Sequence, residues 1–286
     1  NDGPDKGSVV NEAPWILTVG ASTTDRKIKA VAVLGNGAEF EGESAFQPTN
    51  FSRKLLPIVN GNACELLNTS DVKGKIVLCK THGYRSGKDK GVVVKMAGGV
   101  GMILMTEKNL GSTTLSENDV LPTTNVDYND EQMIINYTKS TSTRVATISF
   151  KGTRTGNKHA QTVAYFSSRG LSMQSRGILK PDVIGPGVNI LAAWSASVAA
   201  AITSSTAASS TFFFQSGAVL QSMSSPHLAG VAALLKSAHP EWSPAAIKST
   251  IMTTADYINL GNDLIQDETL KHADLLTLGS GHVNPS

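Results

Sequence analysis

The sequence predicts an α/β protein in which a second, smaller α/β unit is inserted. Three observations support this prediction. The 286 residues are 40% hydrophobic and 17% charged, so the chain can bury a sizeable core and is not disordered as a whole. Short strand and helix patterns alternate between about residues 45 and 145, as they do in α/β folds. The longest helical pattern lies much later, at residues 226–237.

The first 44 residues predict strands. Residues 15–22 are mostly apolar and indicate a buried strand. Residues 29–34 and 38–42 flank Asn36-Gly37, and an Asn-Gly pair favours the tight turn of a β-hairpin. We therefore assign residues 1–44 to the first part of a larger domain.

The pattern changes near residue 45. From there, short apolar runs alternate with helical patterns, and the connections between them are brief. Strands are expected at 75–79 and 121–126, a Gly-rich turn leading into another buried strand at 98–105, and helices at 87–96 and 130–139. This alternation predicts a small α/β insert over residues 45–145.

Residues 146–286 return to the larger domain. A strand is expected at 146–150, and residues 162–170 predict a strand that leads into a turn. Residues 180–194 place Pro and Gly around two short apolar runs. Residues 195–210 are nearly all Ala, Ser and Thr, and this low complexity predicts a mobile loop.

Two helices are expected after that loop. Residues 226–237 place their Leu and Val side chains on one wide apolar face, which predicts a long buried helix. Ser243 and Pro244 supply an N-cap residue and a first-turn proline for the second helix.

The charge balance argues against a nucleic-acid partner. The chain has 25 basic and 23 acidic residues, a net charge of +2, and no basic cluster. A membrane span is not expected either, because the densest apolar stretch, 100–105, falls far short of about 18–20 residues.

Two cysteines and three N-glycosylation sequons bear on the compartment. Cys64 and Cys79 are close enough in sequence to close a short loop, and the sequons begin at Asn50, Asn68 and Asn136. Together they favour a secreted protein with one disulfide over a cytosolic protein with two free thiols. The chain begins with a turn sequence rather than Met, so we expect a processed piece of a longer precursor.

A serine stands just before the longest helix. Ser222 lies where the first backbone N–H groups of the helix and the positive end of its dipole point. This position favours an alkoxide-like nucleophile and the oxyanion that it generates. The alternative is that Ser222 or Ser224 only caps the helix.

The sequence around Ser222 resembles that of the subtilisin-like serine proteases, most closely the plant cucumisin-like subtilases. Residues 222–230, Ser-Met-Ser-Ser-Pro-His-Leu-Ala-Gly, match the family's motif from the catalytic serine onward. Residues 1–4 with 13–21 match the segment that carries the family's oxyanion-hole asparagine. The blocks that flank the nucleophile in the family resemble residues 165–170, 179–187, 242–248 and 279–285. The resemblance covers essentially the whole chain.

This resemblance implies a fold and a set of roles. The fold is a partial subtilisin-like parallel-sheet catalytic domain, with an α/β protease-associated domain inserted at about 45–145. Ser222 is the implied nucleophile, and the side-chain amide of Asn1 is the implied donor to the oxyanion. Cys64 and Cys79 stand where the protease-associated domain usually has a disulfide.

Two features depart from the family pattern. The family's catalytic Asp and His lie upstream of the point where this chain begins, and none of its six histidines has the sequence context of the family's base. His227, five residues after Ser222, is expected to pack or hydrogen-bond on the helix rather than act as the base. Leu220-Gln221 stand where the family has Gly-Thr, which predicts an unusual loop there.

The implied function is that of a secreted serine endopeptidase, located in the apoplast or cell wall, which hydrolyses protein or peptide substrates and needs no cofactor. We expect this chain alone to be inactive and to need the N-terminal portion of the same precursor, with its Asp and His, as a partner. The alternative is an inactive fragment that binds proteins through its protease-associated domain. Another kind of α/β hydrolase is disfavoured, because no Gly-x-Ser-x-Gly elbow occurs.

Overall fold

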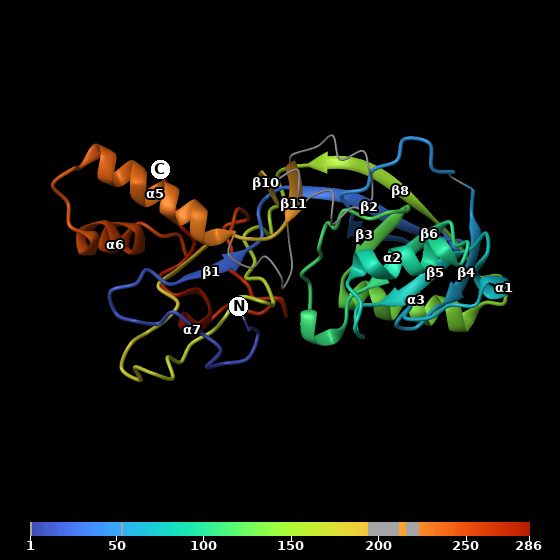
Figure 1. The fold of residues 1–286 in the computed structure, drawn as a ribbon, viewed down its shortest axis with the longest axis horizontal. Helices are drawn as coiled ribbons and strands as arrows, with labels where there is room; N and C mark the ends of the chain where they lie inside the picture. The colour runs from blue at the N-terminus through green and yellow to red at the C-terminus, as the bar shows by residue number, and fades with distance from the viewer. Residues whose placement is uncertain (1, 53, 194–211, 216–222) are drawn as a thin grey trace.

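The fold of the chain was analysed in a computed structural model, which describes residues 2–52, 54–193, 212–215 and 223–286. Two lobes lie side by side (Figure 1). One is a closed β-barrel with helices packed on it. The other, here called the α5 lobe, contains the remaining strands and the C-terminal helices.

Seven strands close the barrel in the order β2-β3-β7-β6-β5-β4-β8. They are β2 (Lys27–Leu34), β3 (Glu39–Glu43), β4 (Leu56–Asn60), β5 (Ile76–Lys80), β6 (Gly101–Met105), β7 (Thr123–Val126) and β8 (Val145–Arg154). Neighbours from β4 through β7 run parallel, whereas β3 joins β7, and β8 joins both β2 and β4, in antiparallel pairs. The predicted hairpin is confirmed as the β2–β3 pair.

Helices cover both faces of the parallel strands. Helix α2 (Gly87–Met96) matches its predicted bounds, α3 (Tyr128–Ser140) is slightly longer than predicted, and α1 (Thr69–Val72) is a single turn. Strand β5 shows how the barrel is packed. Ile76 and Leu78 join a core with α3, while Val77 and Cys79 face a second core with α2. Because both faces are covered, β5 is a continuous apolar run rather than an alternating one.

The α5 lobe is built on a short parallel pair, β1 (Val19–Ser22) with β9 (Val183–Pro186). Helices α5 (Ser224–Ala238) and α6 (Pro244–Thr253) pack on it, and Leu228 and Ile251 are buried against Val183. The shorter elements are η1 (Lys108–Leu110), β10 (Ile190–Ala193), β11 (Phe212–Gln215) and α7 (Leu275–Leu278), with β10 and β11 antiparallel. None of the helices that the structure describes is long and apolar enough to cross a membrane.

The sequence was wrong about two strands. The strand expected at 15–22 begins only at Val19, and the side chain of Trp15 is 82% exposed. Residues 162–170 form isolated bridges instead of a strand. A turn in which Ser167 N donates to Ala164 O follows the bridge between Ser22 and Val163, and the Ser167 hydroxyl accepts from Ala21 N, so this segment pairs only with the end of β1.

The domain limits 1–44, 45–145 and 146–286 stay a prediction. The closed sheet includes β2 and β3, which precede residue 45, and β8, which extends to Arg154. The barrel therefore draws strands from both sides of the predicted insert. The expected loop at 195–210 lies outside the described residues.

Candidate active site

The candidate active site is organised by the approach of α5 to strand β9. Gly185 lies in β9 and Gly187 directly follows the strand. Neither residue has a side chain that would hold the helix away from the sheet. A Cβ atom at Gly185 would lie 2.6 Å from Leu228, and one at Gly187 would lie 2.4 Å from the Ser224 hydroxyl. The Pro- and Gly-rich sequence at 180–194 thus brings the start of α5 against the sheet.

The N-terminus of α5 differs from those of the other long helices. Ser86, Asp127 and Ser243 each cap a helix by accepting a hydrogen bond from a backbone N–H of its first turn. The N-cap residue of α5 is Met223, which makes no such bond. Among the described residues, no capping side chain therefore occupies the first-turn N–H groups of α5, and those groups together with the helix dipole favour a negative charge nearby.

The predicted nucleophile Ser222 and the predicted oxyanion donor Asn1 both lie outside the described residues, as does Leu220-Gln221. Their roles stay predictions. The structure does place the residue that follows Ser222, because Met223 is the N-cap residue of α5. Ser222 is therefore joined by one residue to the start of a helix that is packed on the sheet.

The other polar residues at this helix start have contacts of their own. The Ser224 hydroxyl is buried and donates to Gly185 O at 3.0 Å, while Ser225 is exposed. His227 Nδ1 donates to Met223 O at 2.7 Å, which is the hydrogen-bonding role that the sequence predicted. A hollow of about 250 Å³ opens beside them, between residues 9–11 and 16–19.

A buried ion network fixes the segment that leads into β1. Lys180, whose side chain is fully buried, donates to Asp182 Oδ2 at 2.6 Å and to Ile16 O at 2.8 Å. Lys248 of α6 pairs with the other oxygen of Asp182 at 2.9 Å, and Thr18 N donates to Asp182 Oδ2 at 2.7 Å. Burial lowers the pKa of Lys180, and the hydrogen bond to Asp182 opposes that shift. The network ties β1, β9 and α6 together around one carboxylate.

Three of the other histidines have partners away from this site. His82 pairs with Glu107 on the barrel, His239 stacks on Trp242, and His282 is buried with Nδ1 donating to Val283 O. Burial lowers the pKa of His282 to about 4, so it is neutral near pH 7. Within the described ranges, no group of three or more His, Cys, Asp or Glu side chains could hold a metal ion.

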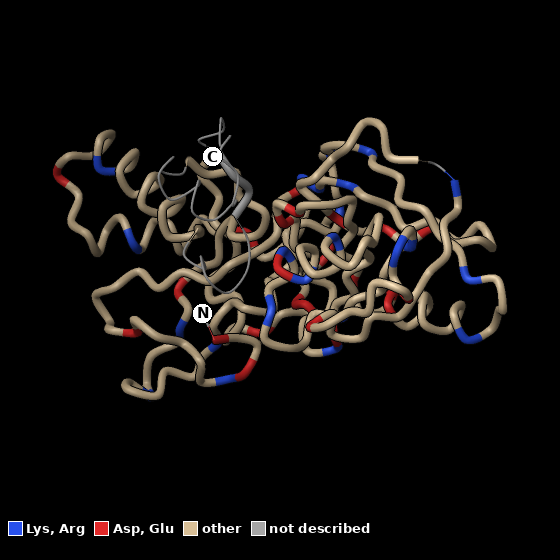
Figure 2. The backbone as a smooth tube through the Cα atoms, turned by 45° about the vertical axis from the view of Figure 1, so that its right-hand side comes forward, with Lys and Arg blue, Asp and Glu red and all other residues tan. Residues whose placement is uncertain are grey.

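The predicted disulfide is confirmed, and the sequons are accessible. Cys64 and Cys79 are bonded, with their Cα atoms 5.5 Å apart, and both are buried under α2. Asn50, Asn68 and Asn136 are all exposed. Lys and Arg alternate with Asp and Glu over both lobes of the described chain (Figure 2).

Comparison with known proteins identifies the family. The model of the subtilase family, Peptidase S8, matches residues 2–280. The chain belongs to the subtilase family. It is 44% identical to subtilisin-like protease SBT1.7 and 42% identical to subtilisin-like protease SBT1.6, both from Arabidopsis thaliana, over 100% and 99% of its own length. It covers 39% and 38% of those two proteins.

The family membership supports a serine-type peptidase at the level of the family and a partial subtilisin domain in this chain. The blocks 179–187 and 242–248 indicate the family, but the resemblance does not predict the network between them. The signal was present, because Lys180, Asp182 and Lys248 are charged residues within otherwise apolar blocks. Charges in such positions are expected to be paired when buried.

Proposed function

We propose that this subtilase chain contributes the nucleophile to a secreted serine endopeptidase. Ser222 attacks a peptide carbonyl, the amine product leaves, and water then hydrolyses the acyl-enzyme. The observation that carries the proposal is the sequence position of Ser222, two residues before a helix whose first-turn N–H groups have no capping side chain among the described residues. The Asn1 side-chain amide and those backbone groups would stabilise the tetrahedral oxyanion.

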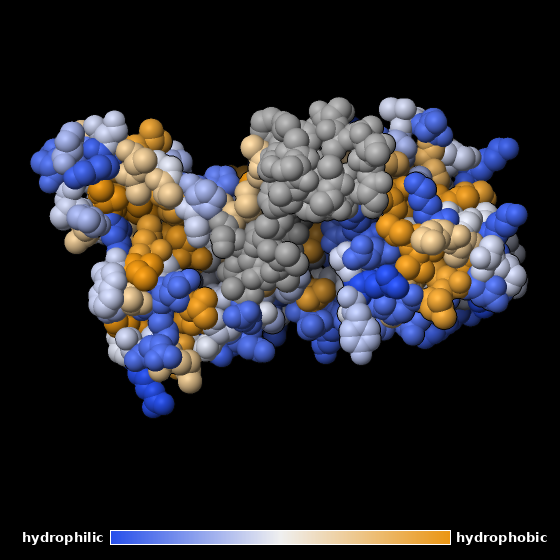
Figure 3. Space-filling model, viewed as in Figure 1, coloured by the Kyte–Doolittle hydropathy of each residue, from blue (hydrophilic) through white to orange (hydrophobic). Residues whose placement is uncertain are grey.

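The partner in this proposal is the N-terminal portion of the same precursor, which supplies the Asp and His. Two observations favour a partner at the α5 lobe. Among the described strands β1 pairs only with β9, and its other edge is joined only near its end, where Ala21 and Ser22 contact residues 163–167. The sequence predicted a buried α5, yet Leu234 is 70% exposed, and Val10, Trp15 and Ile16 are exposed too. Figure 3 shows apolar surface in this lobe.

The decisive test uses a fluorophosphonate probe, which captures a serine only where a base activates it. A protein that also contains the upstream portion should be labelled, and Ser222→Ala should abolish both labelling and peptide hydrolysis. Ser225→Ala is the matched control and should retain most activity, because Ser225 is exposed on the helix. Labelling of the Ser222→Ala variant at the parental level would remove the nucleophile assignment.

The same experiment separates the alternative function. If neither sample is labelled, with or without the upstream portion, the chain would be the inactive protein-binding module that the sequence also allows. In both cases we propose that the region 45–145 is the protease-associated domain, because strands and helices alternate there and a disulfide fixes one of its loops.

Secretion is proposed from the same disulfide and from the exposure of Asn50, Asn68 and Asn136. At least one of these residues should carry a glycan in protein from the natural source. Mass spectrometry of tryptic peptides measures this directly, and three unmodified sequons would contradict passage through the endoplasmic reticulum.

A further inference from the structure

The chain contains two Asn-Gly pairs, Asn36-Gly37 and Asn60-Gly61. In such a pair the backbone nitrogen of the glycine can attack the side-chain amide carbon of the asparagine, because glycine has no Cβ atom to obstruct the five-membered ring that forms. Both asparagines are exposed. Reaction in the folded protein therefore depends on how firmly the structure holds each glycine nitrogen.

The first pair lies at the tip of the hairpin between β2 and β3. Gly37 has a φ of +84°, and its N–H donates to Leu34 O at 2.9 Å, which closes the turn. Asn36 and Gly37 are exposed, and a Cβ atom at Gly37 would have no other atom within 4 Å. The attacking nitrogen is released when this one turn bond opens.

The side chain of Asn36 is already folded back along the main chain. Its Oδ1 accepts a hydrogen bond from Ala38 N at 3.1 Å. A bond from a side-chain oxygen to the second residue onward forms an Asx turn, which bends the side chain over the intervening peptide unit. That peptide unit joins Asn36 to Gly37 and contains the attacking nitrogen.

The second pair has the same side-chain arrangement in a different environment. Asn60 Oδ1 accepts from Asn62 N at 2.9 Å. Gly61 N, however, donates to Leu78 O at 2.9 Å and so extends the hydrogen bonds between β4 and β5. A Cβ atom at Gly61 would lie 2.6 Å from Cys64 Sγ, which is buried in the disulfide. Release of this nitrogen requires that β4 part from β5 beside the disulfide.

We infer that Asn36 is a site of spontaneous deamidation in the folded protein and that the fold protects Asn60. Gly37 N bonds to the amide carbon of Asn36, and the amide nitrogen leaves as ammonia with the proton that Gly37 N gives up. Water then opens the cyclic imide at either carbonyl. The products are aspartate and isoaspartate, in which the main chain is one carbon longer. This chemistry does not depend on the proposed peptidase activity.

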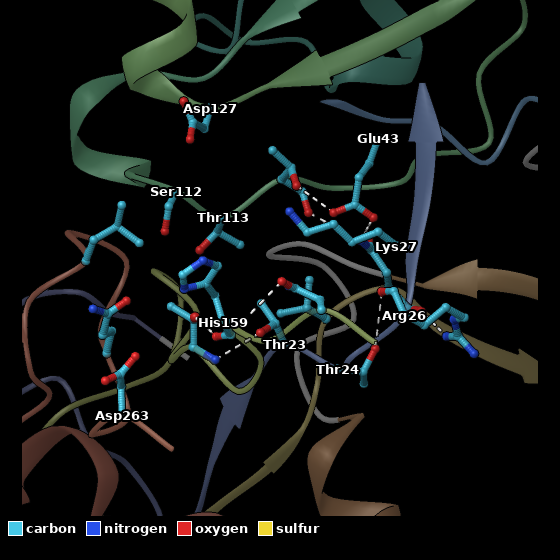
Figure 4. A pocket seen from close by; sticks show the side chains of 17 residues that line it. Thr23, Thr24, Arg26, Lys27, Glu43, Ser112, Thr113, Asp127, His159 and Asp263 are labelled. Atoms are coloured by element: carbon cyan, nitrogen blue, oxygen red, sulfur yellow. Dashed lines mark hydrogen bonds between the residues drawn. The ribbon is translucent and has the colours of Figure 1, made fainter. Parts of the chain in front are cut away.

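The structural change should be confined to the tip of the hairpin. The product adds one negative charge to a chain of net charge +2, and the longer main chain of isoaspartate disrupts the turn between Leu34 and Gly37. The other end of the hairpin is fixed separately. Glu43, the last residue of β3, accepts from Thr114 Oγ1 at 2.6 Å and from Asn189 Nδ2 at 3.0 Å (Figure 4). The barrel should therefore stay closed.

The test incubates the folded protein in mildly alkaline buffer and follows tryptic peptides by mass spectrometry over time. The protein is produced without glycans, so that no asparagine is converted during glycan removal. Fragment spectra assign each amide-to-acid conversion to its residue, and chromatography separates isoaspartate from aspartate. Asn36 should convert at least about tenfold faster than Asn60, because a turn at a hairpin tip opens far more readily than paired strands of a core.

Two controls show that the fold causes the difference. In the reduced protein unfolded in urea, both asparagines should convert at similar rates, because nothing then holds either glycine nitrogen. Asn36→Gln should abolish the fast conversion and leave the rate at Asn60 unchanged, since the longer side chain closes the smaller ring no longer. Thermal unfolding checks that this variant is folded.

Three outcomes would overturn the inference. The first is equal rates at Asn36 and Asn60 in the folded protein, or a faster rate at Asn60. The second is no conversion of Asn36 in the folded protein while the unfolded chain converts, which would show that the turn protects it. The third is an equally large rate difference in the unfolded chain, which would assign the difference to the neighbouring sequence instead of the fold.

Discussion

The buried network around Asp182 predicts a large cost for a small substitution. Asp182→Asn keeps the shape of the side chain and removes its charge. Lys180, which has no exposed side-chain surface, would then have no charged partner and only neutral acceptors, Ile16 O and the amide oxygen of the new side chain. Breaking a buried ion pair by removing one partner typically costs about 3–5 kcal/mol of unfolding free energy, because the remaining charge is desolvated and unpaired. For a chain of this size, that corresponds to a melting temperature lower by roughly 10 °C.

A second Lys–Asp pair in the same protein is the matched control. Lys6 and Asp274 are 3.0 Å apart, but their side chains are 66% and 48% exposed. Asp274→Asn should therefore cost less than about 1 kcal/mol, since both groups stay hydrated. Urea unfolding of the two variants measures the contrast. Equal stability of Asp182→Asn and Asp274→Asn would refute the argument from burial.

The double variant tests the cause. Lys180→Met in the Asp182→Asn background removes the stranded charge and supplies apolar volume in its place. It should recover part of the lost stability, because buried ion pairs can be replaced by apolar side chains at little cost. If the double variant is less stable than Asp182→Asn alone, the lost stability comes from the hydrogen bonds to Thr18 and Lys248 rather than from the charge of Lys180.

Three further predictions follow from the same structure. Free-thiol labelling of denatured, unreduced protein should detect neither Cys64 nor Cys79, and reduction should lower the unfolding free energy by on the order of 3 kcal/mol for a loop of 15 residues. The pKa of His282 is 6.5 in the unfolded chain and about 4 in the folded chain. The free energy of unfolding should therefore fall by about 3 kcal/mol as the pH drops from 6.5 to 4. His282→Gln should remove that part of the pH dependence. Gly187→Ala should destabilise the protein by about 1–3 kcal/mol, because the new Cβ atom would clash with the Ser224 hydroxyl. Gly177→Ala is the control and should not destabilise it, because no atom lies within 4 Å of the position of its Cβ. Equal effects of the two substitutions would contradict the close approach of α5 to the sheet.

Local patterns were sufficient to predict most of the barrel's elements but not its closure. Ser86 followed by residues 87–96 predicted α2 because capping and helical periodicity act within a few residues. The pairing of β2 with β8 joins Lys27 to Arg154, and no local pattern encodes the register of two strands so far apart in sequence. The segment 162–170 shows the converse, since its residues predicted a strand that leads into a turn, and the structure has the turn at Ser167 but only isolated bridges in place of the strand.

The motif around Ser222 identified the family, yet the geometry that surrounds it comes from another block. Along β9, Val183 and Gly185 face α5, and Gly187 follows in the same alternation, so the side chains facing the helix become smaller toward its N-terminus. Ile184 points the other way, into the core with Val163. The helix can therefore come closest to the sheet at the end that Ser222 precedes. A sequence pattern of small residues at every second position thus sets how near the N-terminus of α5 lies to the sheet.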